Sequence, residues 1–99
     1  MKSEKQQAKE AMQDITRAER AQEFLNNPLY IEAITVMKAA MFEQFSDTRF
    51  GDEKDRHELW QRMQLMKQFQ SRFESIVKKG EKGKETLSLL DKALQKIRL

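Results

Sequence analysis

Residues 59–97 decide the fold, and they read LWQRMQLMKQFQSRFESIVKKGEKGKETLSLLDKALQKI. A hydrophobic seam runs through this stretch in alternating steps of three and four residues, a spacing that places side chains on one stripe of a helix. The pattern predicts a long coiled-coil-like helix that packs against other helices. The seam has twelve positions, nine of them apolar: Leu59, Arg62, Met66, Phe69, Phe73, Ile76, Gly80, Gly83, Leu87, Leu90, Leu94 and Ile97.

Two glycines in the seam leave the continuity of this helix open. Gly80 and Gly83 each cost about 1 kcal/mol relative to alanine inside a helix, which favours a break. The heptad phase nevertheless resumes at Leu87 with no residue gained or lost, and a flexible linker has no reason to preserve it. We therefore favour one continuous helix that another backbone approaches closely at both glycines, over a hinge followed by a fourth helix.

Composition favours an all-α chain with a thin core. The 99 residues are 38% hydrophobic and 35% charged, with three glycines, one proline and no cysteine. Because so small and polar a chain buries little apolar area, a partner or a second copy is expected. The absence of cysteine excludes disulfides. No signal peptide and no run of ~20 apolar residues is visible, so we expect a soluble, intracellular protein that does not enter a membrane.

Asn26-Asn27-Pro28 separates two helices. Proline fits the first helical position, where no amide donor is needed, and Asn27 is expected to cap the second helix by accepting a backbone hydrogen bond. That second helix is apolar over a wide arc and should need cover on two sides. One face carries Tyr30, Ile34, Met37, Met41 and Phe45, while Ile31, Val36 and Phe42 lie outside it.

Residues 46–52 form the expected loop, with Asp52 capping the third helix and Phe50 plugging the end of the core. So short a connection makes the helices antiparallel. Trp60, beside the seam, is expected to widen it where the second helix packs. For Arg62 two interpretations stand: the stem packs while the guanidinium reaches solvent, which we favour, or the side chain forms a buried ion pair with Glu43 or Asp47.

The expected fold is an all-α antiparallel helical hairpin or bundle with a long C-terminal helix, in an oligomer. Residues 1–16 are expected as a polar tail or frayed helix and residues 17–99 as a single helical domain. Helices are expected at about 16–26, 28–45, 52–79 and 84–98, the last two merging if the chain continues through the glycines.

A continuous last helix would be about 70 Å long, far more than the second helix can cover. Either the first helix runs back along its C-terminal leucines, or another subunit meets them. We expect homo-oligomerisation through this end. The residues assigned to it are Phe73, Ile76, Gly80, Gly83, Leu87, Leu90, Leu94 and Ile97.

Residues for catalysis are missing. His57-Glu58 opens like the zinc motif H-E-x-x-H, but position 61 is Gln61, so the motif fails. With no cysteine, no Cys/His set can assemble, and no sequence motif marks the single histidine, His57, as part of a Ser/His/Asp triad. We expect no enzyme and no cofactor.

The C-terminal half is the basic one, with twelve Lys/Arg and eight Asp/Glu in residues 50–99 against seven and eight in residues 1–49. Lys78, Lys79, Lys82 and Lys84 either contact DNA phosphates, which would give weak and non-specific binding, or form a solvated stretch of helix. We favour the second interpretation.

Three stretches carry a resemblance: residues 21–33 (AQEFLNNPLYIEA), residues 55–60 (DRHELW), and residues 73–77 (FESIV) followed by Lys79-Gly80. Over residues ~17–90, within the usual uncertainty of element ends, the chain resembles a loose group of small helical proteins of tailed bacteriophages and prophages. Their genes lie among those for virion assembly and DNA packaging. The chain departs from that group at Gly83, a second glycine close behind the first.

The resemblance implies a non-enzymatic phage protein that acts by helix-mediated self-association in virion assembly or DNA packaging. Its partners would be further copies of itself and phage packaging or capsid proteins. Its location would be the cytoplasm of the bacterial host or the virion. Two alternatives are kept: a nucleic-acid-binding accessory that uses the basic C-terminal half, and a small phage inhibitor of a host protein.

Overall fold

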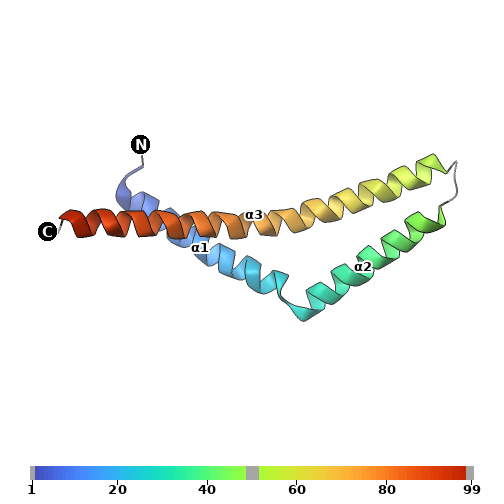
Figure 1. Cartoon of the computed structure of the whole chain (residues 1–99), viewed down its shortest axis with the longest axis horizontal. Helices are drawn as coiled ribbons and strands as arrows, with labels where there is room; N and C mark the ends of the chain where they lie inside the picture. The colour runs from blue at the N-terminus through green and yellow to red at the C-terminus, as the bar shows by residue number, and fades with distance from the viewer. Residues whose placement is uncertain (1, 49–51, 98–99) are drawn as a thin grey trace. The chain divides into compact units, whose positions relative to one another are not determined.

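Three helices account for most of the chain. The computed structural model describes residues 2–48 and 52–97, with the backbone alone at Ile97. The helices are α1 (Glu4–Leu25), α2 (Pro28–Asp47) and α3 (Glu53–Ile97) (Figure 1). The expected all-α fold with a long C-terminal helix is confirmed.

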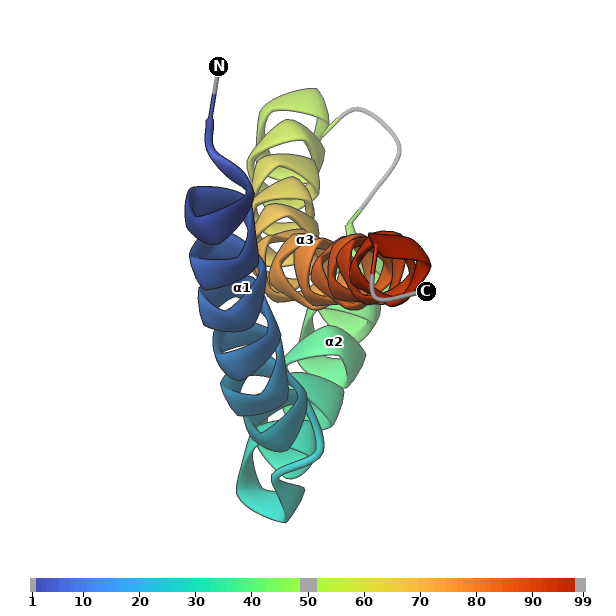
Figure 2. The same cartoon turned by 90° about the vertical axis from the view of Figure 1, so that its left-hand side faces the viewer.

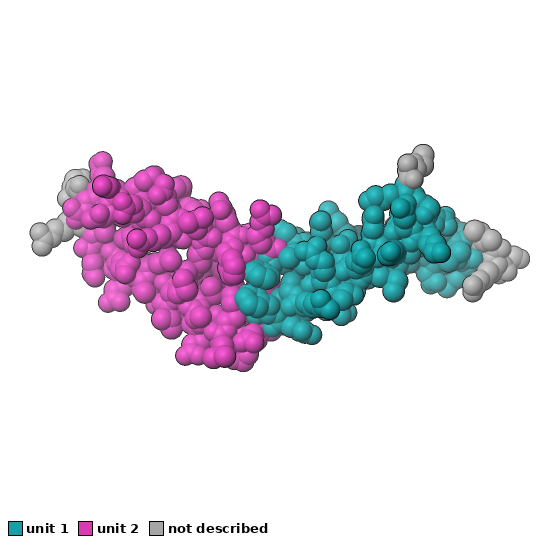
Figure 3. Space-filling view, turned by 180° about the vertical axis from the view of Figure 1, so that it is seen from behind, with its two compact units in different colours: residues 1–24, 73–99 teal, residues 25–72 magenta. Residues whose placement is uncertain are grey.

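The chain divides into two compact units, coloured separately in Figure 3. Unit 1 contains residues 1–24 and 73–99, and so combines α1 with the C-terminal part of α3. Unit 2 contains residues 25–72, and so combines α2 with the N-terminal part of α3. Each unit is therefore built on a different stretch of the same helix.

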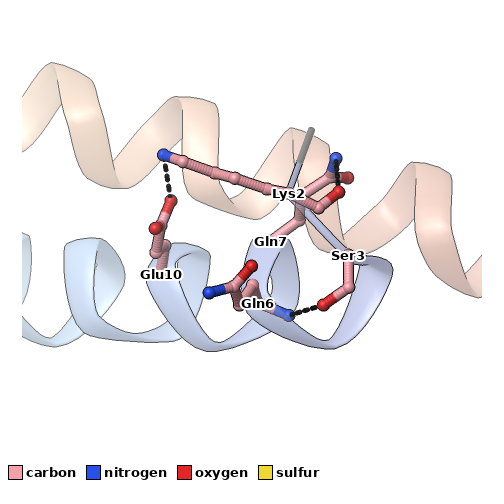
Figure 4. Close-up of polar contacts among 5 residues, drawn as sticks. All are labelled: Lys2, Ser3, Gln6, Gln7 and Glu10. Atoms are coloured by element: carbon pink, nitrogen blue, oxygen red, sulfur yellow. Dashed lines mark hydrogen bonds and ion pairs between the residues drawn. The ribbon is translucent and has the colours of Figure 1, made fainter.

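The first helix begins at Glu4, about a dozen residues before the expected start near residue 16. Ser3 caps the N-terminus of this helix, because its hydroxyl oxygen accepts a hydrogen bond from the backbone N–H of Gln6 at 3.1 Å (Figure 4). The same figure shows the Lys2 ammonium donating to a Glu10 carboxylate oxygen at 2.8 Å. That hydrogen bond raises the pKa of Lys2, but an exposed pair of this kind adds little stability.

The boundary at Asn27-Pro28 is confirmed in detail. The side-chain oxygen of Asn27 accepts hydrogen bonds from the backbone N–H groups of Leu29, at 2.9 Å, and Tyr30, at 3.3 Å. Pro28 occupies the start of α2, where its missing N–H costs nothing. Two donors that the first helical turn leaves unpaired are thus satisfied by one side chain.

In unit 1, α3 runs unbroken through Gly80 and Gly83, and the backbone that approaches it there belongs to α1. A Cβ at Gly80 would overlap the Cβ of Ala18. A Cβ at Gly83 would lie 2.7 Å from the carbonyl oxygen of Ala11. The continuous helix with a close neighbour is therefore confirmed, and the hinge with a separate fourth helix is wrong.

The contacts in unit 1 run in opposite directions along the two helices. Phe24 stacks on Phe73, with ring centroids 4.6 Å apart and an angle of 24° between the rings. Ala18 lies against Gly80, and Ala11 lies against Gly83. The residue numbers of the contacts therefore decrease along α1 as they increase along α3. The two helices are therefore antiparallel, and Figure 2 shows them beside one another. Ala11 and Ala21 are the buried residues of α1.

In unit 2, α2 and α3 are also antiparallel. The Arg56 guanidinium carbon lies 4.6 Å from the centroid of the Phe45 ring, near the connection between the helices. Further along, Leu59 and Met66 of α3 are buried. The loop residue Phe50, expected to plug the end of the core, lies outside the described residues.

In this part of α3, the structure decides between the two interpretations of Arg62 and corrects the expectation for Trp60. Arg62, Glu43 and Asp47 are all exposed, which rules out the buried ion pair and agrees with the solvent-facing interpretation. Trp60 was expected to widen the contact with the second helix, but it is 52% exposed. Its ring stacks on the ring of the exposed His57, with the two centroids 5.8 Å apart. About half of the Trp60 surface is therefore open to solvent.

Candidate self-association surfaces

The second helix has no core of its own. No residue of α2, which is described over its whole length, is buried. Leu29 is 75% exposed, Val36 61% and Phe42 68%. Single exposed apolar side chains are ordinary, but a helix that leaves so many uncovered indicates an interaction surface. The wide apolar arc is therefore covered by α3 on one side only.

One of the exposed surfaces is a groove between α2 and α3, which we call the methionine groove. It has a volume of about 350 Å³. Its apolar lining is bordered by two ammonium groups, one from each helix. Methionine side chains are unbranched and adapt to irregular partners, so a groove of this kind suits an apolar side chain from another molecule. The lining residues are Lys38, Met41, Phe42, Met63, Met66 and Lys67.

A second surface, which we call the glutamate edge, lies on another side of α2. Leu29, Ala33, Val36 and Ala40 recur in steps of four, three and four, so they form one stripe, and all four are exposed. Exposed Glu32 and Glu43 border this stripe. At about 100° per residue, Val36 points about 120° away from Phe42 in the groove. The edge and the groove are thus separate surfaces of the same helix.

Seven of the eight residues predicted for oligomerisation fall into three groups. Gly80 and Gly83 are buried against α1 of the same chain, so their burial needs no second copy. Leu94 is 48% exposed, and every residue from 91 to 96 is exposed. The side chain of Ile97 lies outside the described part. Half-buried residues make up the third group, Phe73, Ile76, Leu87 and Leu90. Their part in oligomerisation stays a prediction.

Lys78, Lys79, Lys82 and Lys84 are all exposed on α3, as either interpretation of them requires. Residues 73–99 hold seven Lys/Arg and four Asp/Glu, whereas residues 25–72 hold seven of each. The positive charge of the chain is therefore carried by unit 1, and unit 2 has a formal charge near zero.

Within residues 2–48 and 52–97, no three His, Cys, Asp or Glu side chains gather in a group that could hold a metal ion. In the same part of the chain, no helix has the length and apolar character to cross a membrane.

Neither the groove nor the edge was predicted from the sequence, in which the C-terminal seam is the longest apolar pattern. The available indication was the placement of Ile31, Val36 and Phe42 outside the main stripe of α2. Combined with the charges beside them, Lys38 on one flank and Glu32 on another, it distinguishes two surfaces of opposite sign.

Comparisons of the chain with protein-family models, with curated proteins and with solved structures find no match. Over residues 2–48 and 52–97 the chain is all-α, with three helices that leave much apolar surface exposed. This exposure hints at self-association.

Proposed function

We propose that the chain works without catalysis, by associating with further copies of itself as a helical component of a larger assembly. The observation that carries the proposal is α2, an apolar helix with no buried residue. Burying a large apolar side chain contributes about 1.5–3 kcal/mol. The free energy gained by burying several such side chains is large enough to offset the translational and rotational entropy lost on association.

The setting we propose for this assembly is the construction of a phage particle or the packaging of its DNA. The support is the resemblance of residues 21–33, 55–60 and 73–77 to small phage proteins. Phage packaging or capsid proteins would then be further partners. Expression of the chain during infection, followed by its recovery with assembling particles, tests this setting. Its absence from every assembly intermediate would contradict it.

Self-association itself is tested by sedimentation velocity across the micromolar range. We expect the average mass to fall on dilution. A triple variant with Leu29→Ser, Val36→Ser and Phe42→Ser should stay monomeric, because it removes the most exposed apolar side chains of α2. The matched control is Met12→Ser, which changes an exposed apolar residue of unit 1. A wild-type chain that stays monomeric at every concentration would refute the proposal.

A second candidate function is supported by the four exposed lysines in the basic part of α3. If they contact DNA phosphates, affinity for duplex DNA should fall steeply as salt is added. Reversal of charge at Lys78, Lys79, Lys82 and Lys84 should abolish that binding. Binding that ignores both salt and the four reversals would exclude this function.

A further inference from the structure

We infer that copies of this chain associate head to tail, with the methionine groove of one copy receiving the glutamate edge of α2 from the next. The inference rests on the proposed self-association and specifies its interface. Both surfaces belong to unit 2, so one unit carries the two halves of the contact.

Charge decides which surfaces can meet. The groove is bordered by Lys38 and Lys67, and its described lining contains no acidic side chain. The edge is bordered by Glu32 and Glu43. Groove on groove would bring ammonium groups together, and edge on edge would bring carboxylates together. Only groove on edge sets opposite charges against each other, and complementary charge suppresses the wrong pairings.

The shapes of the two surfaces agree with this pairing. Leu29 and Val36 lie seven residues apart, about two turns along α2, and are the large side chains of the edge. Ala33 and Ala40 lie between and beyond them, and their small side chains allow another helix to come close. A groove of about 350 Å³ has room for projecting side chains, while the helix itself stays outside.

A contact between two different surfaces leaves one of each free at the ends. A pair formed in this way still carries an open groove on one copy and an open edge on the other. Further copies therefore add to the assembly. If the rotation between neighbouring copies closes on itself the product is a ring, and otherwise it is an open filament. A two-fold contact, by contrast, would stop at the dimer.

The test uses full-length variants with charges reversed on one surface at a time. The groove variant is Lys38→Glu with Lys67→Glu, and the edge variant is Glu32→Lys with Glu43→Lys. Each variant alone should self-associate roughly tenfold or more weakly, because like charges now face each other. An equimolar mixture should regain wild-type association, and so should one chain that carries all four changes.

Controls with the same change in charge lie in unit 1. Lys79→Glu with Lys82→Glu matches the groove variant, and Glu81→Lys with Glu85→Lys matches the edge variant, all at exposed positions. We expect neither control to weaken association. Circular dichroism checks that every variant keeps its helices.

A second pair of variants tests the direction of the contact. Phe42→Asp blocks the groove, and Val36→Asp blocks the edge. Mixed together they should form a complex of one copy each and nothing larger, because each contributes the only intact surface that the other needs.

The outcomes separate the two proposals. If the wild type associates but neither the mixture nor the four-change chain recovers, the head-to-tail contact is refuted and self-association stands. A wild type that forms only a dimer, whatever its concentration, also refutes head-to-tail growth. A wild type that never associates refutes both.

Discussion

The carbonyl oxygen of Ala11 lies 2.7 Å from the position that a Cβ would occupy at Gly83. Real Cβ atoms do not come this close to a backbone oxygen, so α1 can approach α3 here only because the residue is glycine. The conformational cost of glycine in a helix, about 1 kcal/mol, is thus offset by contact between two backbones. This relationship lets the backbones of α1 and the C-terminal part of α3 approach closely at this point.

Gly83→Ala should destabilise the protein by about 1–3 kcal/mol, although alanine favours a helix. The added methyl group meets the Ala11 carbonyl oxygen and lies 3.3 Å from Cγ1 of Ile15, so α1 must move away. Urea unfolding followed by circular dichroism measures the change. The control is Ser75→Ala, at an exposed position of the same helix. An increase in stability like that of an ordinary exposed Gly→Ala change would contradict the close contact.

Gly80→Ala should also destabilise the protein, and Ala18→Gly should recover part of the loss in the double variant. The reason is that a Cβ at position 80 overlaps the Cβ of Ala18, which the second change removes. Recovery should be incomplete, since the Asp14 carbonyl oxygen still lies 3.2 Å from the new methyl group. A double-mutant cycle measures the coupling, and strictly additive effects would argue against direct contact.

Asn27→Ala should cost about 1 kcal/mol of stability, because two backbone donors at the start of α2 lose their acceptor. Asn27→Asp keeps an acceptor oxygen and should be close to neutral. Asn26→Ala, one residue earlier, is the control. Pro28→Ala should be tolerated within about 1 kcal/mol, since proline at this position contributes a local preference only. Thermal unfolding of the four variants checks the order.

Leu94→Asp and Leu87→Asp should act differently. Leu94 is exposed, so its change should leave the unfolding free energy within about 0.5 kcal/mol of wild type. Weaker self-association of the Leu94→Asp variant would place the C-terminal turns of α3 in the interface between copies. Leu87 is half-buried, so an aspartate there should destabilise unit 1. Denaturation and sedimentation of both variants separate the two effects, and equal destabilisation would place Leu94 in a core.

Local chemistry explains what the sequence could predict. Asn27-Pro28 was predictable because capping and the geometry of proline depend on neighbouring residues alone. The unbroken α3 was predictable because heptad phase survives across Gly80 and Gly83. The start of α1 was missed, although Ser3 and Gln6 have the spacing of a capping box, because residues 1–16 show only a weak apolar stripe. Tertiary packing on α3 supplies the stabilisation that this stripe does not reveal.

The surfaces were harder to predict than the helices. Whether α1 or another subunit covers the glycines depends on which helix reaches them, and periodicity does not specify that. The same holds for Trp60, since its exposure follows from how α2 is placed against α3. The apolar side chains outside the main stripe of α2 were visible in the sequence, but their grouping into a groove and an edge needs both helices in place.

The chain has a single tryptophan, and its indole lies over the ring of the single histidine on the exposed flank of unit 2. Intrinsic fluorescence excited at the indole therefore reports on unit 2 alone, whereas far-ultraviolet dichroism averages over both units. Superimposed melting curves from the two probes would mean that the units unfold as one cooperative body. Separated curves would give each unit its own transition, without any label being attached.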